Sequence, residues 1–264
     1  MINAPVFDSL VDRGVSVSGV HFIVKSVFCC CLVAFVAGLS LSSVFAAEND
    51  CHPLIDPEKP QYMIGYGSLM ESASKHATEP HAGINLPVLV TGFKRSWNTH
   101  GVYPTTYLGV QRSESATMVA ALYRDFLNAE GKLSSDAREI DYCRAAVDPA
   151  NIEMLDGSRV PTASEIWTYT TKLSSMAVPD PVHPIVQSYV DIFITGCLQM
   201  QVRVSEPDFD FVEQCVLTTD GWSKHWVNDR IYPRRPFHYE PNAFKIDGYL
   251  NRLLPEVIKE VRIE

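Results

Sequence analysis

A glycine-containing stretch constrains the fold of this chain more than any other segment. The apolar run 62–65 leads into Gly65-Tyr66-Gly67-Ser68, and residues that favour a helical turn follow. This order predicts a buried strand, a tight loop and the beginning of a helix. Such a loop lets backbone N–H groups converge on one point, where a carboxylate or phosphate can be held. The alternative is a simple turn after a strand, because the dinucleotide pattern and the P-loop lysine are both missing.

The composition is that of a globular protein. Hydrophobic residues make up 46% of the 264-residue chain, which argues against disorder. The net charge of -9 argues against nucleic acid as a partner and leaves small molecules or proteins. Without a leader, residues 47–264 have the length of a single domain with a full core.

An uncharged apolar segment precedes that domain. Residues 26–47 follow Lys25, and Val44-Phe45-Ala46 supplies the small residues expected before a cleavage point. We predict that residues 1–46 are a signal peptide and that the mature chain is exported, to a periplasm or outside the cell. The alternative is an uncleaved anchor over 26–47, because about 20 apolar residues span a bilayer. The membrane is a partner only in that case.

Four cysteines remain in the mature chain, namely Cys51, Cys143, Cys197 and Cys215. In an exported protein they can form two disulfides, with three possible pairings. We predict that Cys51 is bridged, because it lies in an otherwise untethered lead-in. Cys197 lies on an apolar helical stripe, where a buried free thiol is the alternative.

The order of the expected elements indicates the fold class. Strands are expected over 62–65, over 86–97 with a bend or bulge at Gly92, and over 105–111, 116–126, 144–147 and 165–169. Helices are expected over 133–142, over 184–202 as an amphipathic helix on the sheet, and over 249–261 with a break at Pro255. This order predicts an α+β fold, in which a mixed sheet curls toward a small barrel and helices pack against it.

Two common kinds of site find no support in the sequence. The eight histidines are scattered and form no metal-binding pattern, so we predict no metal. A serine-hydrolase site is also disfavoured, because Gly65-Tyr66-Gly67-Ser68 lacks a glycine two positions after the serine.

Glu139 is the remaining candidate for chemistry. It lies where the predicted helix 133–142 gives way to a strand, and its apolar neighbours indicate partial burial. Burial raises a carboxyl pKa and lets the group carry protons at neutral pH. The alternative is that Glu139 or Asp141 pairs with Arg138 or Arg144 on a solvated face.

Two motifs together resemble the γ-glutamylcyclotransferase-like (AIG2-like) superfamily. The first is Tyr66-Gly67-Ser68-Leu69 after the first strand, and the second is Arg138-Glu139-x-x-Tyr142-x-Arg144. Between them, Gly92-Phe93-Lys94 and residues 106–110 also match in type and order, and the similarity covers residues 62–196. Many members have asparagine where this chain has Leu69, a difference that bears on the subfamily and the leaving group more than on the fold.

The resemblance implies a small mixed β-barrel flanked by helices, with the loop facing Glu139 across a pocket. It implies that Tyr66, Gly67, Ser68 and Leu69 hold the γ-glutamyl part of a small substrate and that no cofactor is needed. The implied reaction is attack of the substrate's own α-amino group on its γ-amide carbonyl, which releases 5-oxoproline and an amine or amino acid. Tyr142 then orients Glu139 or lines the pocket, unless it is a core tyrosine.

The implied chemistry also makes physical sense. The α-amine must lose a proton before it attacks, and the departing amine must gain one, which a single carboxyl with a raised pKa can accomplish. A loop that grips the glutamyl end supplies the orientation that ring closure requires. The alternative function is a catalytically silent exported binding or interaction protein on the same fold, because fold does not imply function.

The segment 221–236 lies beyond the resemblance and concentrates aromatic residues, cations and prolines. It can cover the pocket and offer an arginine to a substrate carboxylate. In the alternative interpretation, Trp222 and Trp226 anchor the segment to the domain and its arginines are solvated.

Overall fold

The computed structural model describes residues 51–101, 103–235 and 242–264. All elements given below belong to the unit Ala47–Glu264, which residue contacts separate from Met1–Ala46. The predicted signal peptide and the alternative anchor over 26–47 lie outside the described residues. Within the described part of the chain, no helix has both the length and the apolar character that crossing a membrane requires.

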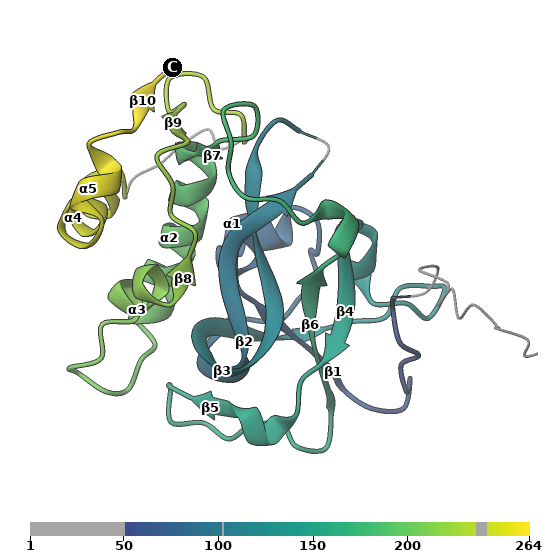
Figure 1. Ribbon diagram of the computed structural model, residues 1–264. Helices are drawn as coiled ribbons and strands as arrows, with labels where there is room; N and C mark the ends of the chain where they lie inside the picture. The colour runs from purple at the N-terminus through teal and green to yellow at the C-terminus, as the bar shows by residue number, and fades with distance from the viewer. Residues whose placement is uncertain (1–50, 102, 236–241) are drawn as a thin grey trace, which may run out of the picture. The chain divides into compact units, whose positions relative to one another are not determined.

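A mixed sheet of seven strands forms the centre of this unit (Figure 1). The strand order is β4-β6-β1-β3-β2-β5, and β8 pairs with β2. Strand β1 runs parallel to β6 and antiparallel to β3, which makes the sheet mixed and confirms the α+β class. The bounds are β1 Gln61–Gly65, β2 Leu86–His100, β3 Thr106–Asp125, β4 Tyr142–Ala146, β5 Ile152–Met154, β6 Glu165–Thr171 and β8 Thr219–Asp220.

The sheet differs from the expected barrel because it stays open. Among the described strands, β4 and β5 at its two ends do not pair with each other. Beyond β2 the sheet continues through the short strands β5 and β8, and neither of these pairs with β4. The described strands therefore form an open sheet and not a closed barrel.

Strands β2 and β3 form a long hairpin that contains the predicted irregularity. Gly92 has φ +90° and coincides with a register shift between Thr91 and Phe93, so the bulge expected there is confirmed. The two strands expected over 105–111 and 116–126 are one strand, β3. Between them, Arg112 still pairs with Phe93, whereas residues 113–116 have no partner on β2 and lie opposite the register shift at Gly92.

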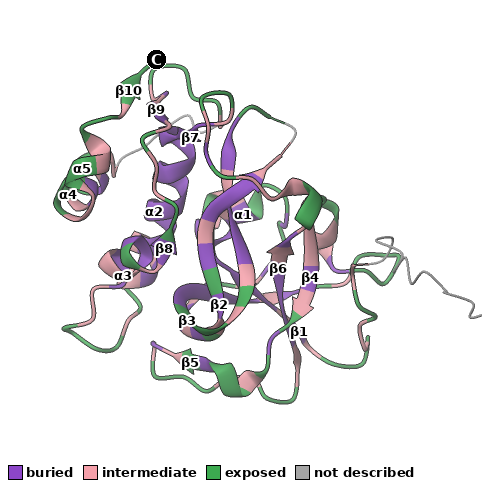
Figure 2. Cartoon of the chain, viewed as in Figure 1, coloured by how far each residue is buried: buried purple, intermediate pink, exposed green. Residues whose placement is uncertain are grey.

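Helix α2 is buried on nearly all sides rather than amphipathic (Figure 2). It contacts β2 on one side and helices α3 and α4 on another, so little of it faces solvent. The helical elements are η1 Ser68–Met70, α1 Ser72–His76, η2 Ser134–Ala137, η3 Pro149–Asn151, η4 Leu173–Ser175, α2 Gln187–Gln201, α3 Phe211–Leu217, α4 Ala243–Leu253 and α5 Pro255–Ile258. A small parallel sheet, β10-β9-β7, comprises β7 Ile185–Val186, β9 Trp226–Asn228 and β10 Arg262–Ile263.

The helix expected over 133–142 is wrong in length. Only the turn η2 forms, and the chain then leaves the helical conformation before Glu139. The hydroxyls of Ser134 and Ser135 donate to the two carboxylate oxygens of Asp125, at 2.6 and 2.5 Å. These bonds tie the turn to the end of β3 and bring the residues that follow it to the pocket described below.

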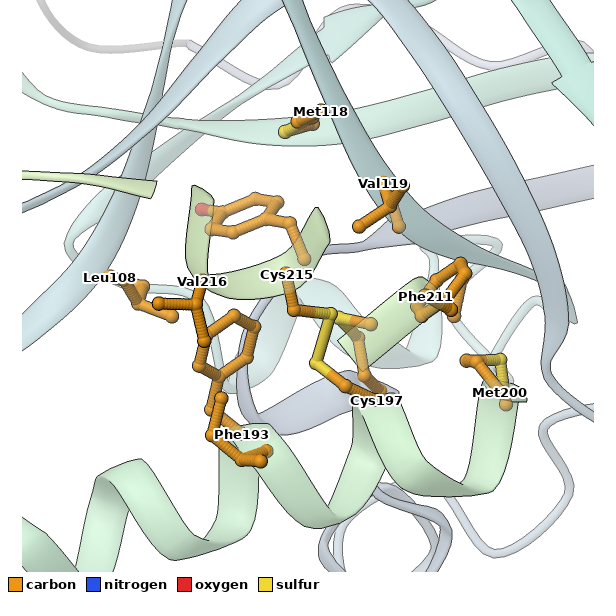
Figure 3. Packing of buried hydrophobic residues seen from close by; sticks show 14 of the residues in the cluster. Leu108, Met118, Val119, Phe193, Cys197, Met200, Phe211, Cys215 and Val216 are labelled. Carbon is orange, nitrogen blue, oxygen red and sulfur yellow. A yellow bond between two sulfur atoms is a disulfide. The ribbon is translucent and has the colours of Figure 1, made fainter. Parts of the chain in front are cut away.

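Two disulfides join the four cysteines of the described residues. Cys51 is bonded to Cys143, which connects the lead-in to β4, as expected for the otherwise untethered segment. Cys197 is bonded to Cys215 and is therefore not a free thiol. Figure 3 shows this second bridge between α2 and α3, packed among Phe193, Met200, Phe211 and Val216 in the main core.

Candidate active site

A pocket of about 210 Å³ opens where β1 ends. All six residues singled out from the sequence line it, namely Tyr66, Gly67, Ser68, Leu69, Glu139 and Tyr142. The other lining residues are Ile64, Gly101, Tyr103, Tyr107, Leu108, Arg138, Ile140, Asp141, Tyr169, Tyr189 and Arg235. The fold therefore brings the two motifs, about seventy residues apart in the sequence, to one cavity.

The carbonyl groups of the loop after β1 are held by buried side chains. The guanidinium of Arg95 donates to the carbonyl of Tyr66 at 3.2 Å. The amide of Asn85 donates to the carbonyls of Leu69 and Met70, at 3.1 and 2.7 Å. Both donors are almost fully buried. These carbonyl groups of the loop therefore already accept hydrogen bonds from the protein's own side chains.

The N–H groups of the same loop are available. Among the described residues, none accepts a hydrogen bond from the backbone N–H of Gly67, Ser68 or Leu69. A buried N–H group without a partner is costly, so a row of them indicates a place for an acceptor that comes from outside. A Cβ at Gly67 would lie 2.8 Å from the hydroxyl of Tyr189, so a larger residue here would displace that side chain.

Arg138 connects the two motifs. Its Nη2 donates to the hydroxyl of Ser68 at 2.6 Å, and its Nε lies 3.3 Å from Oε1 of Glu139. Its Nη1 donates to Thr78 and to the carbonyl of Ser74, at 2.9 and 3.2 Å. The guanidinium therefore fixes the glutamate relative to the loop. The sequence pattern contained this arginine but did not reveal its bridging position.

Glu139 is largely enclosed, since its side chain is 12% exposed. Burial raises the pKa of its carboxyl, while the nearby cations Arg138 and Arg235 oppose that increase. The ion pair considered from the sequence exists with Arg138, but it lies in the pocket and not on a solvated face. Arg144 instead pairs with Asp136, at 2.5 Å.

Tyr142 lines the pocket from β4, next to the second motif's glutamate. Its hydroxyl donates to the carbonyl of Leu108 at 3.0 Å and not to Glu139. Tyr142 therefore lines the wall, and Arg138 is the residue that contacts Glu139. Burial raises the pKa of the Tyr142 hydroxyl well above its ordinary value, so it remains protonated at neutral pH.

Three further pocket residues were not assigned to the site from the sequence. Tyr107 lies in the strand expected over 105–111 and Tyr189 in the helix expected over 184–202, and their rings meet edge to face at 5.2 Å. Arg235 belongs to the segment 221–236, for which one of the two interpretations was that it offers an arginine to the pocket, although the sequence did not single out which arginine. Only the folded chain shows that α2 and this segment complete one wall of the pocket.

The sequence suggested that the histidines are scattered, but two of them lie close together in the structure. In the described part of the chain, His100, Asp180 and His183 have possible ligand atoms within 4.8 Å of one another. However, the two imidazole rings are stacked, with centroids 4.2 Å apart and planes at 25°. The lone pairs of imidazole lie in the ring plane, so stacked rings do not direct them at one ion. The arrangement does not favour a metal centre.

Comparison with known proteins gives similarity at the level of structure alone. No protein-family model and no curated protein matches the chain. A solved "Gamma-glutamyl cyclotransferase" is 12% identical, with a TM-score of 0.44, over 72% of this chain and 98% of its own. A yeast γ-glutamyl cyclotransferase specific to glutathione is 9% identical, with a TM-score of 0.34, over 61% and 97%.

An uncharacterised human protein is 13% identical, with a TM-score of 0.41, over 61% of this chain and 89% of its own. Two of the three solved proteins thus carry the name of the superfamily that the sequence motifs resemble. Because the identities and TM-scores are low, the activity has to be argued from the site itself.

Proposed function

We propose that this chain is a cofactor-free γ-glutamyl cyclotransferase, which releases 5-oxoproline from a γ-glutamyl amino acid, amine or peptide. The observation that carries the proposal is the position of Glu139. A largely buried carboxyl lies beside a loop with unpaired N–H groups, and one arginine contacts both. The resemblance of the motifs supports the same assignment, and so does the pocket, which has room for a small molecule.

In this proposal the loop holds the γ-glutamyl part of the substrate. The N–H groups of Gly67, Ser68 and Leu69 donate to an oxygen of that part and, as the amine attacks, to the developing oxyanion. Tyr66 and Tyr142 enclose the substrate and limit access of water. Holding both ends of the future ring together supplies much of the rate, because the attack is intramolecular.

Glu139 acts as base and then as acid. Its carboxylate takes a proton from the α-ammonium group, and the free amine attacks the γ-carbonyl carbon to form the five-membered ring. The same carboxyl gives that proton to the departing nitrogen, and the C–N bond breaks. The carboxylate then takes the second proton from the ring nitrogen and passes it to the released amine, which leaves 5-oxoproline, an ammonium group and the original carboxylate. A raised pKa suits both steps, because the group must give up its proton as readily as it takes one.

We also propose that the mature enzyme, residues 47–264, works after export. Support comes from the uncharged leader, with its small residues before Ala47, and from the two disulfides, since such bonds persist in oxidising compartments. The partner is then a small γ-glutamyl substrate, with no role for nucleic acid, and the membrane enters only if the leader stays attached.

The test is a comparison of wild type and Glu139→Gln on γ-glutamyl amino acids, γ-glutamyl amines and glutathione, with 5-oxoproline measured by mass. We expect kcat to fall roughly 100-fold or more, because glutamine cannot accept the proton. Binding of substrate and the melting temperature should change little. Glu114→Gln, on an exposed part of β3, is the matched control and should remain active.

The pH profile adds a second measure. Because burial raises the pKa of Glu139, the acidic limb of kcat/KM should lie above the ordinary range of a glutamate and should vanish in Glu139→Gln. A variant that keeps most of its kcat would contradict the mechanism. A wild type that binds a γ-glutamyl compound but never releases 5-oxoproline would instead support the silent binding protein.

A further inference from the structure

The pocket contains a second group that is suited to an anion. Arg235 lines the pocket close enough to Glu139 for its charge to oppose the raised pKa of that carboxyl, and a side-chain hydrogen bond links it to Tyr107. No described carboxylate forms an ion pair with it. Its Nε–H is buried and has no hydrogen-bond partner among the described residues. A buried donor without an acceptor costs free energy, so this arrangement calls for an acceptor supplied by a ligand.

Two aromatic rings and a backbone contact hold Arg235 in place. Its guanidinium carbon lies 5.5 Å from the ring centre of Tyr107 and 5.9 Å from that of Tyr189. Its backbone N–H donates to the hydroxyl of Ser188 at 3.2 Å, and that hydroxyl donates to the buried Asp229 at 2.6 Å. A guanidinium packed on ring faces keeps its N–H edge free for a carboxylate.

The other cation of the pocket is already committed. Arg138 bonds to Ser68, Thr78 and the carbonyl of Ser74, and it pairs with Glu139. It therefore positions the catalytic groups and has few donors left for a ligand. Of the two arginines that line the pocket, Arg235 is the one with an unpaired buried donor.

The loop N–H groups and Arg235 are two separate sets of hydrogen-bond donors, and Tyr189 contacts both. Tyr189 lies against the loop, because a Cβ at Gly67 would approach its hydroxyl to 2.8 Å, and its ring also lies beneath Arg235. A ligand that satisfies both sites needs acceptor oxygens at two separate ends. Among γ-glutamyl compounds, those with an amino acid as leaving group have a carboxylate at each end.

We propose that Arg235 binds the carboxylate of the leaving amino acid, so that the enzyme selects γ-glutamyl amino acids over γ-glutamyl amines. This inference rests on the proposed function, because it takes the γ-glutamyl part to be held by the loop. Arg235 then determines specificity and does not take part in the proton transfers. Since a planar guanidinium pairs with a carboxylate through two parallel hydrogen bonds, the contact also fixes the orientation of the leaving group.

The experiment uses two substrates that differ only in the leaving-group carboxylate, γ-glutamyl-alanine and γ-glutamyl-ethylamine. Wild type should prefer γ-glutamyl-alanine. Arg235→Gln should raise KM for γ-glutamyl-alanine by roughly 10- to 100-fold with little change in kcat, as expected for loss of a charge-assisted contact. The same variant should turn over γ-glutamyl-ethylamine about as well as wild type.

Two further variants control for the fold and the charge. Arg234→Gln changes the neighbouring arginine, whose side chain contacts Glu264 and the carbonyl of Pro104 outside the pocket, and should behave as wild type. Arg235→Lys keeps the charge without the planar fork and should fall between wild type and Arg235→Gln. Equal loss on both substrates in Arg235→Gln, or no loss on either, would overturn the assignment.

The inference can fail separately from the proposed function. If wild type releases no 5-oxoproline from either compound, the proposed function fails, and the binding of both compounds is then measured by calorimetry. Tighter binding of γ-glutamyl-alanine that disappears in Arg235→Gln would still support the carboxylate site. Equal binding of both compounds to wild type would overturn it.

Discussion

Gly196 offers a test of how helix α2 supports the loop of the site. A Cβ added at Gly196 would lie 2.7 Å from the backbone nitrogen of Glu71 and 2.7 Å from both the carbonyl carbon and the Cβ of Met70. Real Cβ atoms do not approach backbone this closely, so in Gly196→Ala the helix and the chain just after the loop must move apart. The perturbation therefore acts on Ser68 and Leu69 without changing a pocket residue.

The magnitude follows from two opposing effects. Alanine stabilises the interior of a helix by about 1 kcal/mol relative to glycine. Overpacking at a tight contact costs about 1–3 kcal/mol. Gly248 is the matched control, because it lies inside helix α4, is exposed, and has no atom within 4 Å of an added Cβ. Gly248→Ala should gain about 1 kcal/mol, and Gly196→Ala should lie about 1–3 kcal/mol below it.

The assay is thermal unfolding of both variants together with steady-state kinetics. For a domain of this size, each 1 kcal/mol corresponds to roughly 2–4 °C in Tm. Gly196→Ala should also raise KM, because the loop N–H groups move, whereas Gly248→Ala should leave KM unchanged. If Gly196→Ala melts as high as Gly248→Ala and keeps its KM, close packing of α2 does not position the loop.

Three other predictions concern pH, redox state and processing. Burial raises the pKa of Glu79 to about 7, so the folded form holds a proton that the unfolded form releases between about pH 4.5 and 7, and stability falls as the pH rises through that range. The free energy of unfolding of Glu79→Gln should therefore rise by up to about 3 kcal/mol relative to that of wild type between pH 5 and pH 8. Urea unfolding at each pH measures this difference, and a difference that stays constant with pH would contradict the prediction. Replacing both Cys51 and Cys143 by serine opens a loop with a sequence separation of 92 and should cost about 2–5 kcal/mol, seen as a lower urea midpoint than that of the oxidised wild type. N-terminal sequencing of exported protein should begin at Ala47, whereas a full-length chain retained in the membrane would favour the anchor.

The parts of the site that are local in the sequence were the ones that could be predicted. Strand β1 and the loop after it follow from an apolar run that ends in glycines, and the bulge at Gly92 follows from a glycine inside a strand pattern. Glu139 was identified from the short motif 138–144, which resembles a known family. Each of these features depends on a few residues that are neighbours in the sequence, and the local conformations that these residues favour are the ones found in the folded chain.

The remaining parts depend on contacts between distant segments. Helix α2 was expected to be amphipathic, because a periodic apolar stripe does not reveal that a second layer of helices covers the opposite side. The turn η2 replaces a longer helix because Asp125, on another element, binds its serines. Arg235 lines the pocket although its segment follows both motifs by many residues in the sequence, and no local sequence pattern predicts that it lies close to them.

Leu69 shows why a departure from a motif need not disturb the site. In the structure its side chain is buried in the smaller core cluster, and its carbonyl accepts a hydrogen bond from Asn85. Asn85 is itself oriented by the buried Lys75, whose Nζ donates to its side-chain oxygen at 2.6 Å. The loop is thus held by contacts to its backbone, which do not depend on a polar side chain at position 69. Since its N–H groups remain unpaired among the described residues, the donors that the proposed reaction requires are retained although the asparagine is not.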